Sequence, residues 1–233
     1  MKTQKLFLAL LLFVTSSFAL AQTNSFDKDA AQWHKKAVMT CGMLRDIKTF
    51  DQQKMLSNLD ELSTELNALQ TKYAENPPKE YANDPLWKNY FEDFADNIAI
   101  VKERVENKQY RLVSNYCGNF CRIFGRMHKN NGLTDLTDLM FSLRAEIRGA
   151  MDMYGAKNYT GAKQSLPIIR KLFNRVNAKV KAKENKEFAE SFDLLNSSVK
   201  NWIEAMGKNH FVLVTENFNM FMNAFPKPYM MTL

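Results

Sequence analysis

Apolar residues recur along most of the chain at intervals of three and four positions, which is the period of an α-helix. Alternating runs rich in Val, Ile and Thr, which would indicate strands, are missing, and the 233 residues include only 8 Gly and 6 Pro. The pattern therefore predicts an all-α protein. The expected helices cover residues 27–48, 52–74, 85–106, 109–129, 134–155, 160–182, 186–206 and 209–224.

Two breaks divide this pattern. The segment Glu75-Asn76-Pro77-Pro78 cannot continue a helix, because its two prolines lack a backbone donor and fix φ. The segment Asn130-Asn131-Gly132 interrupts the pattern at mid-chain. Potential N-capping residues precede several of the expected helices, namely Asp51, Asp84, Asn158 and Asn185. The mid-chain break predicts two domains, residues 22–131 and 132–233.

The two sides of the mid-chain break resemble each other, which indicates an internal repeat. At a constant offset of 101 positions, one apolar stripe matches another: Val113, Cys117, Phe120, Cys121 and Phe124 correspond to Val214, Phe218, Phe221, Met222 and Phe225. Short connections place successive helices side by side and antiparallel. The sequence therefore predicts two antiparallel four-helix bundles in tandem, with the first and fourth helices of each bundle as neighbours.

Residues 1–21 have the features of a cleavable secretory signal peptide. Lys2 and Lys5 precede a short apolar segment, Leu6 to Val14, and Ala19-Leu20-Ala21 supplies the small residues of a cleavage site. The apolar segment is too short to cross a bilayer as a helix, which takes about 20 residues. We therefore expect export, with a mature chain that starts near Gln22 and has no membrane span.

The charge of the chain excludes few partners but favours none. The formal net charge is +7, and it becomes +5 when residues 1–21 are removed, because they contain two lysines and no acids. Basic and acidic residues alternate without the clustered basic stripe that nucleic-acid binding requires. We therefore expect no nucleic-acid partner; a redox protein or another exported protein is the partner class to consider.

The chain resembles the cytochrome c′ and cytochrome b562 group of periplasmic four-helix haem proteins. The segment 87–98 is similar to the third helix of that family, and the segment 116–124 is similar to its haem-attachment helix. The resemblance implies a bacterial periplasmic protein that binds haem and serves in electron transfer or in the binding of small gases.

The attachment motif differs from that of the family, which is Cys-x-x-Cys-His with an aromatic residue three positions after the His. With Phe124 at the aromatic position, Cys117 occupies the first Cys, Phe120 the second Cys and Cys121 the axial His. A register shifted by one residue places Cys121 at the second Cys and Arg122 at the His. Both registers lack the imidazole ligand, so we expect an altered or lost haem site.

An altered haem site would have to use other ligands. Cys thiolate can be an axial haem ligand, which makes Cys121 a candidate iron ligand. His34, Val38 and Cys41 lie on one face of the first helix because they are spaced by four and three. The resemblance places Val38 on the distal side of the haem. The candidate haem pocket thus consists of Cys117, Cys121, Phe120, Phe124, His34, Val38 and Cys41.

Two further interpretations use the same residues. Without haem, the phenylalanines of both repeats would fill the two cores with aromatic area. The second repeat has no Cys or His at the motif positions, which favours this interpretation there. In an oxidising compartment, Cys41 on the first helix could also form a disulfide with Cys117 or Cys121 on the fourth. The sequence leaves that pairing open.

No hydrolase or phosphate-binding signature occurs in the sequence. We therefore expect a non-enzymatic protein. The leading expectation is a cytochrome c′-like protein of the periplasm with an altered haem site. The alternative is a haem-free helical protein with a binding or structural role.

Overall fold

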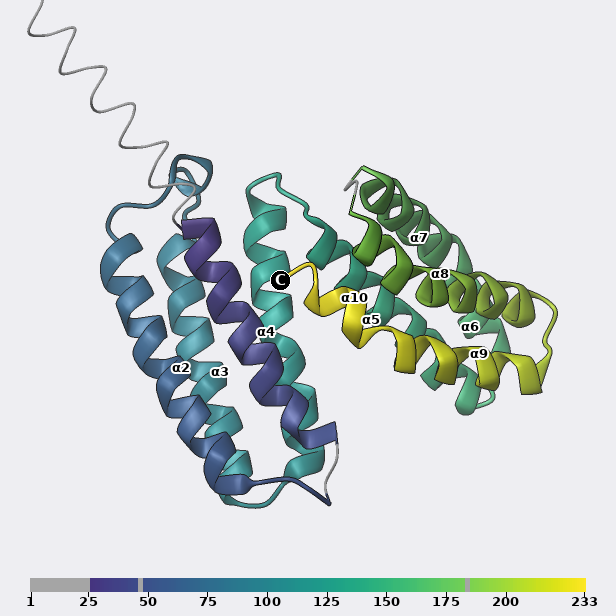
Figure 1. The fold of residues 1–233 in the computed structure, drawn as a ribbon, viewed down its shortest axis with the longest axis horizontal. Helices are drawn as coiled ribbons and strands as arrows, with labels where there is room; N and C mark the ends of the chain where they lie inside the picture. The colour runs from purple at the N-terminus through teal and green to yellow at the C-terminus, as the bar shows by residue number, and fades with distance from the viewer. Residues whose placement is uncertain (1–25, 46–47, 183–184) are drawn as a thin grey trace, which may run out of the picture. The chain divides into compact units, whose positions relative to one another are not determined.

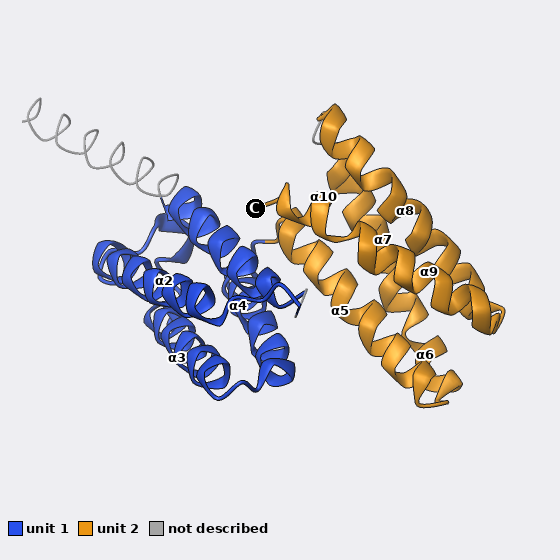
Figure 2. Ribbon diagram, turned by 60° about the horizontal axis from the view of Figure 1, so that its bottom comes forward, with its two compact units in different colours: residues 1–133 blue, residues 134–233 orange. Residues whose placement is uncertain are grey.

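A computed structural model describes residues 26–45, 48–182 and 185–233. The predicted signal peptide at residues 1–21 lies outside this part of the chain. The described residues are predominantly helical and contain no strand, which confirms the all-α class. The chain divides into two compact units, unit 1 at residues 1–133 and unit 2 at residues 134–233 (Figure 2).

The described part of unit 1 opens with a helix at residues 26–42, called the N-terminal helix below, which tightens into a short 3-10 turn at Met43–Arg45. Helices α2 (Gln52–Tyr73), α3 (Trp87–Glu106) and α4 (Tyr110–Asn130) follow, with a 3-10 turn at Lys79–Tyr81 between α2 and α3. α3 packs against both α2 and α4, and the N-terminal helix, purple in Figure 1, lies beside α4. The first helix ends before the predicted residue 48, at Gly42, a residue type that weakens helices.

An aromatic cluster fixes the corner between α2 and α3, where the chain passes through the Pro77-Pro78 loop. The ring of Phe26 meets the edges of Tyr73, Tyr81 and Trp87 with centroids 5.0 to 5.4 Å apart. The indole Nε1 of Trp87 donates a hydrogen bond to the carbonyl of Tyr73 at 3.0 Å. These contacts hold the end of α2 and the start of α3 together across the loop that contains the two prolines.

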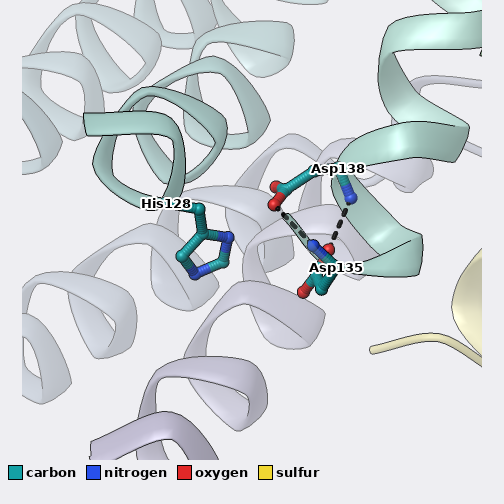
Figure 3. A group of neighbouring side chains, drawn as sticks. All are labelled: His128, Asp135 and Asp138. Carbon is teal, nitrogen blue, oxygen red and sulfur yellow. Dashed lines mark hydrogen bonds between the residues drawn. The ribbon is translucent and has the colours of Figure 1, made fainter. Parts of the chain in front are cut away.

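Unit 2 starts with α5 (Leu136–Gly155), whose N-terminus carries a reciprocal capping box. The Asp135 side chain accepts a hydrogen bond from the backbone N–H of Asp138 at 2.7 Å, and the Asp138 carboxylate accepts from the N–H of Asp135 at 3.3 Å (Figure 3). Such a box satisfies donors that the first turn leaves without helical partners. It fixes the start of α5 directly after the boundary between the units.

Five further helices complete the described part of unit 2: α6 (Tyr159–Gln164), α7 (Leu166–Lys181), α8 (Lys186–Gly207), α9 (Phe211–Ala224) and α10 (Pro226–Met230). α8 packs against α7 and α9, and α5 packs against α6 and α7. The prediction of one continuous helix over 160–182 is wrong. Pro167 lacks a backbone N–H, and its ring would clash with the carbonyl four residues earlier, so the chain breaks at Ser165.

None of the helices in the described part of the chain is both long and apolar enough to cross a membrane.

The cap of α2 provides a direct test of the local contacts in unit 1. The carboxylate of Asp51 accepts a hydrogen bond from the backbone N–H of Lys54 at 2.9 Å. We expect Asp51→Ala to lower the free energy of unfolding of unit 1 by about 1 kcal/mol, because the first turn of α2 loses this acceptor. Urea unfolding followed by circular dichroism measures the change. Asp51→Asn is the control, since its amide oxygen can still cap the helix, and equal losses in the two variants would contradict the capping role.

Candidate functional site

A disulfide bond joins Cys41, at the end of the N-terminal helix, to Cys117 on α4. Their Cα atoms are 5.8 Å apart, within the usual range for disulfides, and 76 positions separate them in the sequence. Both cysteines are half-buried. Of the two pairings that the sequence left open, this is the one present in the structure.

Cys121 retains its thiol and lies in the core of unit 1 beside His34 of the N-terminal helix. Nε2 of His34 is 3.3 Å from Sγ of Cys121. His34 is 5% exposed and Cys121 is 8% exposed, so bulk water hardly reaches the pair. The imidazole also stacks on the ring of Phe124, with centroids 4.3 Å apart and planes inclined by 20°. This stacking fixes the orientation of the imidazole toward the thiol.

The disulfide and the His34–Cys121 pair follow one another along the same helix–helix contact. From Cys117 to Cys121 the chain advances along α4, whereas from Cys41 to His34 it goes back along the N-terminal helix. The two helices therefore run in opposite directions. Four residues of an α-helix rise about 6 Å, so the thiol lies roughly one turn from the disulfide.

Aromatic side chains occupy the core around this contact. Phe120 and Phe124 of α4 are buried, and both lie against Trp33 of the N-terminal helix, with centroids 5.8 and 6.0 Å away. Phe94 of α3 closes the cluster at 4.7 Å from Phe124. Nε1 of Trp33 donates to the carbonyl of Leu62 on α2 at 2.9 Å, which ties the cluster to the remaining helix of unit 1.

A haem does not fit the residues found here. The cavity beside Phe124 has a volume of about 10 Å³, roughly the room that one water molecule needs, and its lining is apolar. The sulfur of Cys117 is bonded to that of Cys41, so Cys117 has no thiol that could form a thioether with haem. The direct contact of His34 with Cys121, the candidate iron ligand, leaves no gap for a macrocycle between these two side chains.

The remaining candidate positions lie as follows. Val38 is half-buried, while its neighbours Ala37 and Thr40 are buried. Arg122, the ligand position of the shifted register, is exposed and donates to the side chain of Asn119. The register that assigns Cys121 to the ligand position is therefore the one whose side chain faces the core.

In unit 2 the matching positions contain no sulfur–imidazole pair. Phe221 and Phe225 are buried and meet edge to face at 5.7 Å, and Tyr229 of α10 stacks on Phe225 at 5.0 Å. Phe218 and Met222 are half-buried. Aromatic side chains thus occupy these core positions of unit 2.

Sequence reasoning grouped His34 and Cys121 in one pocket but missed their direct contact. It also missed Trp33 and Phe94, which surround the phenylalanines of α4. A signal was present, since Trp33, His34 and Ala37 continue the apolar spacing of the N-terminal helix. The partner of each residue, however, depends on how far one helix is shifted along the other.

Comparison with known proteins gives no assignment: no protein-family model, no curated protein and no solved structure matches the chain.

The disulfide predicts a large contribution to the stability of unit 1. We expect Cys117→Ser to lower the free energy of unfolding of this unit by about 2–5 kcal/mol, because the unfolded chain loses a long covalent loop. Urea unfolding followed by Trp fluorescence in a Trp202→Phe background reports on Trp33 and Trp87 of unit 1.

Cys121→Ser is the matched control, since it leaves the disulfide intact. Adding a reductant should destabilise the wild-type protein and Cys121→Ser alike, because both contain the Cys41–Cys117 bond. An identical unfolding curve for the wild-type protein with and without reductant would contradict the assigned bond.

Proposed function

We propose that this protein is an exported, haem-free helical protein of the bacterial periplasm that acts by binding another protein. In this proposal each unit keeps a four-helix bundle of the cytochrome c′ type as a rigid scaffold. The observation that carries it is the core of unit 1, where Trp33, Phe94, Phe120 and Phe124 occupy the space that the resemblance assigns to haem.

The chemistry of the sulfur atoms supports the loss of the cofactor. Attachment of haem needs reduced thiols on the fourth helix, but Cys117 forms a disulfide and Phe120 occupies the second attachment position. Disulfides persist in oxidising compartments such as the periplasm, which agrees with the predicted export. The same bond replaces part of the stability that a bound cofactor would contribute to the bundle.

The exposed apolar side chains of α9 support a binding role. Phe211, Val212, Leu213 and Met220 are all exposed large apolar side chains of this helix, and Glu216 is the only charged residue between Phe211 and Ala224. Exposed apolar side chains that gather on one element are typical of protein-binding surfaces. Most other helices of the described chain carry charged residues on their outer faces, so α9 is the element that we assign to the partner.

The cofactor part of the proposal is tested by an absorption spectrum and an intact mass. The protein is expressed to the periplasm of a host that attaches haem to c-type cytochromes. We expect a colourless protein whose mass is that of the mature polypeptide less two hydrogen atoms, because one disulfide has formed. A Soret band with added haem mass would indicate covalent attachment, and a Soret band without it would indicate a b-type site. Either band would overturn the proposal.

The binding part is tested by placing a photo-crosslinking residue on the surface of unit 2 in the native host. Val212 on α9 is 56% exposed, and Ile168 on α7 is 53% exposed, so the two positions are matched in exposure and chemistry. We expect one discrete protein adduct from position 212 and none from position 168. The same adducts from both positions, or none from position 212, would contradict a binding role for α9.

A further inference from the structure

The contact between the N-terminal helix and α4 contains a disulfide, a thiol and an imidazole. The Cys121 thiol touches His34, and the Cys41–Cys117 disulfide lies about one helical turn further along the same contact. The haem-free binding role uses none of this chemistry. Thiols react with disulfides whenever a thiolate forms within reach, so the arrangement itself raises the question of exchange.

His34 is placed to generate that thiolate. Its Nε2 lies 3.3 Å from Sγ of Cys121, and in the tautomer with the proton on Nδ1 this nitrogen accepts the thiol proton. The ring cannot turn away freely, because it is 5% exposed and stacked on Phe124. A Cys–His contact of this kind activates the sulfur as a nucleophile.

We propose that His34, Cys121 and the Cys41–Cys117 disulfide form a thiol–disulfide exchange site that moves the single thiol of the protein from Cys121 to Cys117. His34 takes the proton of Cys121, and the resulting thiolate attacks Sγ of Cys41. The bond between Cys121 and Cys41 forms while the bond between Cys41 and Cys117 breaks. Cys117 leaves as a thiolate and receives the proton from the His34 imidazolium, so no oxidant or reductant is consumed.

Helix geometry selects Cys41 as the sulfur that is attacked. Attack on Cys117 would create a bond between Cys117 and Cys121 within α4, where Cβ atoms four residues apart are about 5–6 Å from one another. A disulfide needs Cβ atoms about 3.5–4.5 Å apart, so that product would distort the helix. A bond between Cys41 and Cys121 joins two different helices, and forming it requires closing the distance of about one helical turn between them.

The exchange changes how accessible the single thiol is to reactants in solution. Cys121 is 8% exposed, whereas Cys117 is half-buried. The resting protein therefore stores its thiol in the core, and the exchanged form presents it at the edge of the helix pair. The class of reactant is a disulfide or another thiol-reactive compound of the exported compartment, which would modify Cys117. This inference does not depend on which protein α9 binds.

Trapping with N-ethylmaleimide tests the exchange on the full mature protein under native, non-reducing conditions at pH 7. Acid quenching and pepsin digestion preserve the disulfides, and tandem mass spectrometry locates the label, since Gly118, Asn119 and Phe120 separate the two cysteines of α4. We expect the label on Cys117 together with a cross-linked peptide that contains Cys41 and Cys121. A label on Cys121 with Cys41–Cys117 intact, a label on Cys41, or no label would each overturn the proposal.

Variants separate the imidazole from the fold. We expect His34→Gln to slow labelling of Cys117 by about tenfold or more at pH 7, because the general base is lost. His34→Phe keeps an aromatic ring on Phe124 and should slow it equally. His210 is an exposed histidine of unit 2, so His210→Gln is the control, and its Cys117 should be labelled at the wild-type rate.

A Cys121→Ser variant should show no label on Cys117 and an intact Cys41–Cys117 bond. Wild-type labelling rates in both His34 variants, in protein with a native circular dichroism spectrum, would overturn the role of His34. Labelling of Cys117 in Cys121→Ser would overturn the exchange itself. Neither result bears on the Soret test or on the cross-linking from α9, so the proposals fail separately.

Discussion

The contact between the N-terminal helix and α4 is the interaction on which unit 1 depends. The two helices are far apart in the sequence, and a covalent bond between Cys41 and Cys117 joins them. Trp33 of the N-terminal helix meets both Phe120 and Phe124, so two buried rings of α4 pack against the first helix. Because such a bond restricts the unfolded chain, it favours the folded arrangement that brings these rings together.

The same contact fills the core of unit 1 with aromatic side chains. The rings of Trp33, Phe94 and Phe124 pack against one another, and the cavity left beside them is about 10 Å³. Aromatic side chains bury large areas and pair favourably edge to face, so these rings give unit 1 a dense core.

Unit 2 reaches a dense core without any cysteine. Phe221, Phe225 and Tyr229 form a continuous row of ring contacts from α9 into α10, and Trp202 of α8 is fully buried. The buried side of α9 therefore packs into the unit, while Val212, Leu213 and Met220 are exposed on its other side. This division assigns stability and binding to opposite sides of one helix, and it separates the proposed binding surface in unit 2 from the sulfur chemistry in unit 1.

The sequence by itself determined the all-α class and most helix boundaries, because these depend on local features. Apolar spacing marks the helices, Asp51 and Asn185 cap two of them as predicted, and the Pro77-Pro78 segment separates α2 from α3. The break at Ser165 was also a local signal, since Pro167 was visible in the sequence, but the strong apolar period around it masked its effect.

Only the tertiary structure decided which side chains meet. Cys117 and Cys121 are four residues apart and share a face of α4, so either could pair with Cys41 as far as the sequence is concerned. The choice depends on the shift of the N-terminal helix along α4, and that shift is set by the packing of Trp33 against Phe120 and Phe124. Once it is set, Cys117 meets Cys41 and Cys121 meets His34.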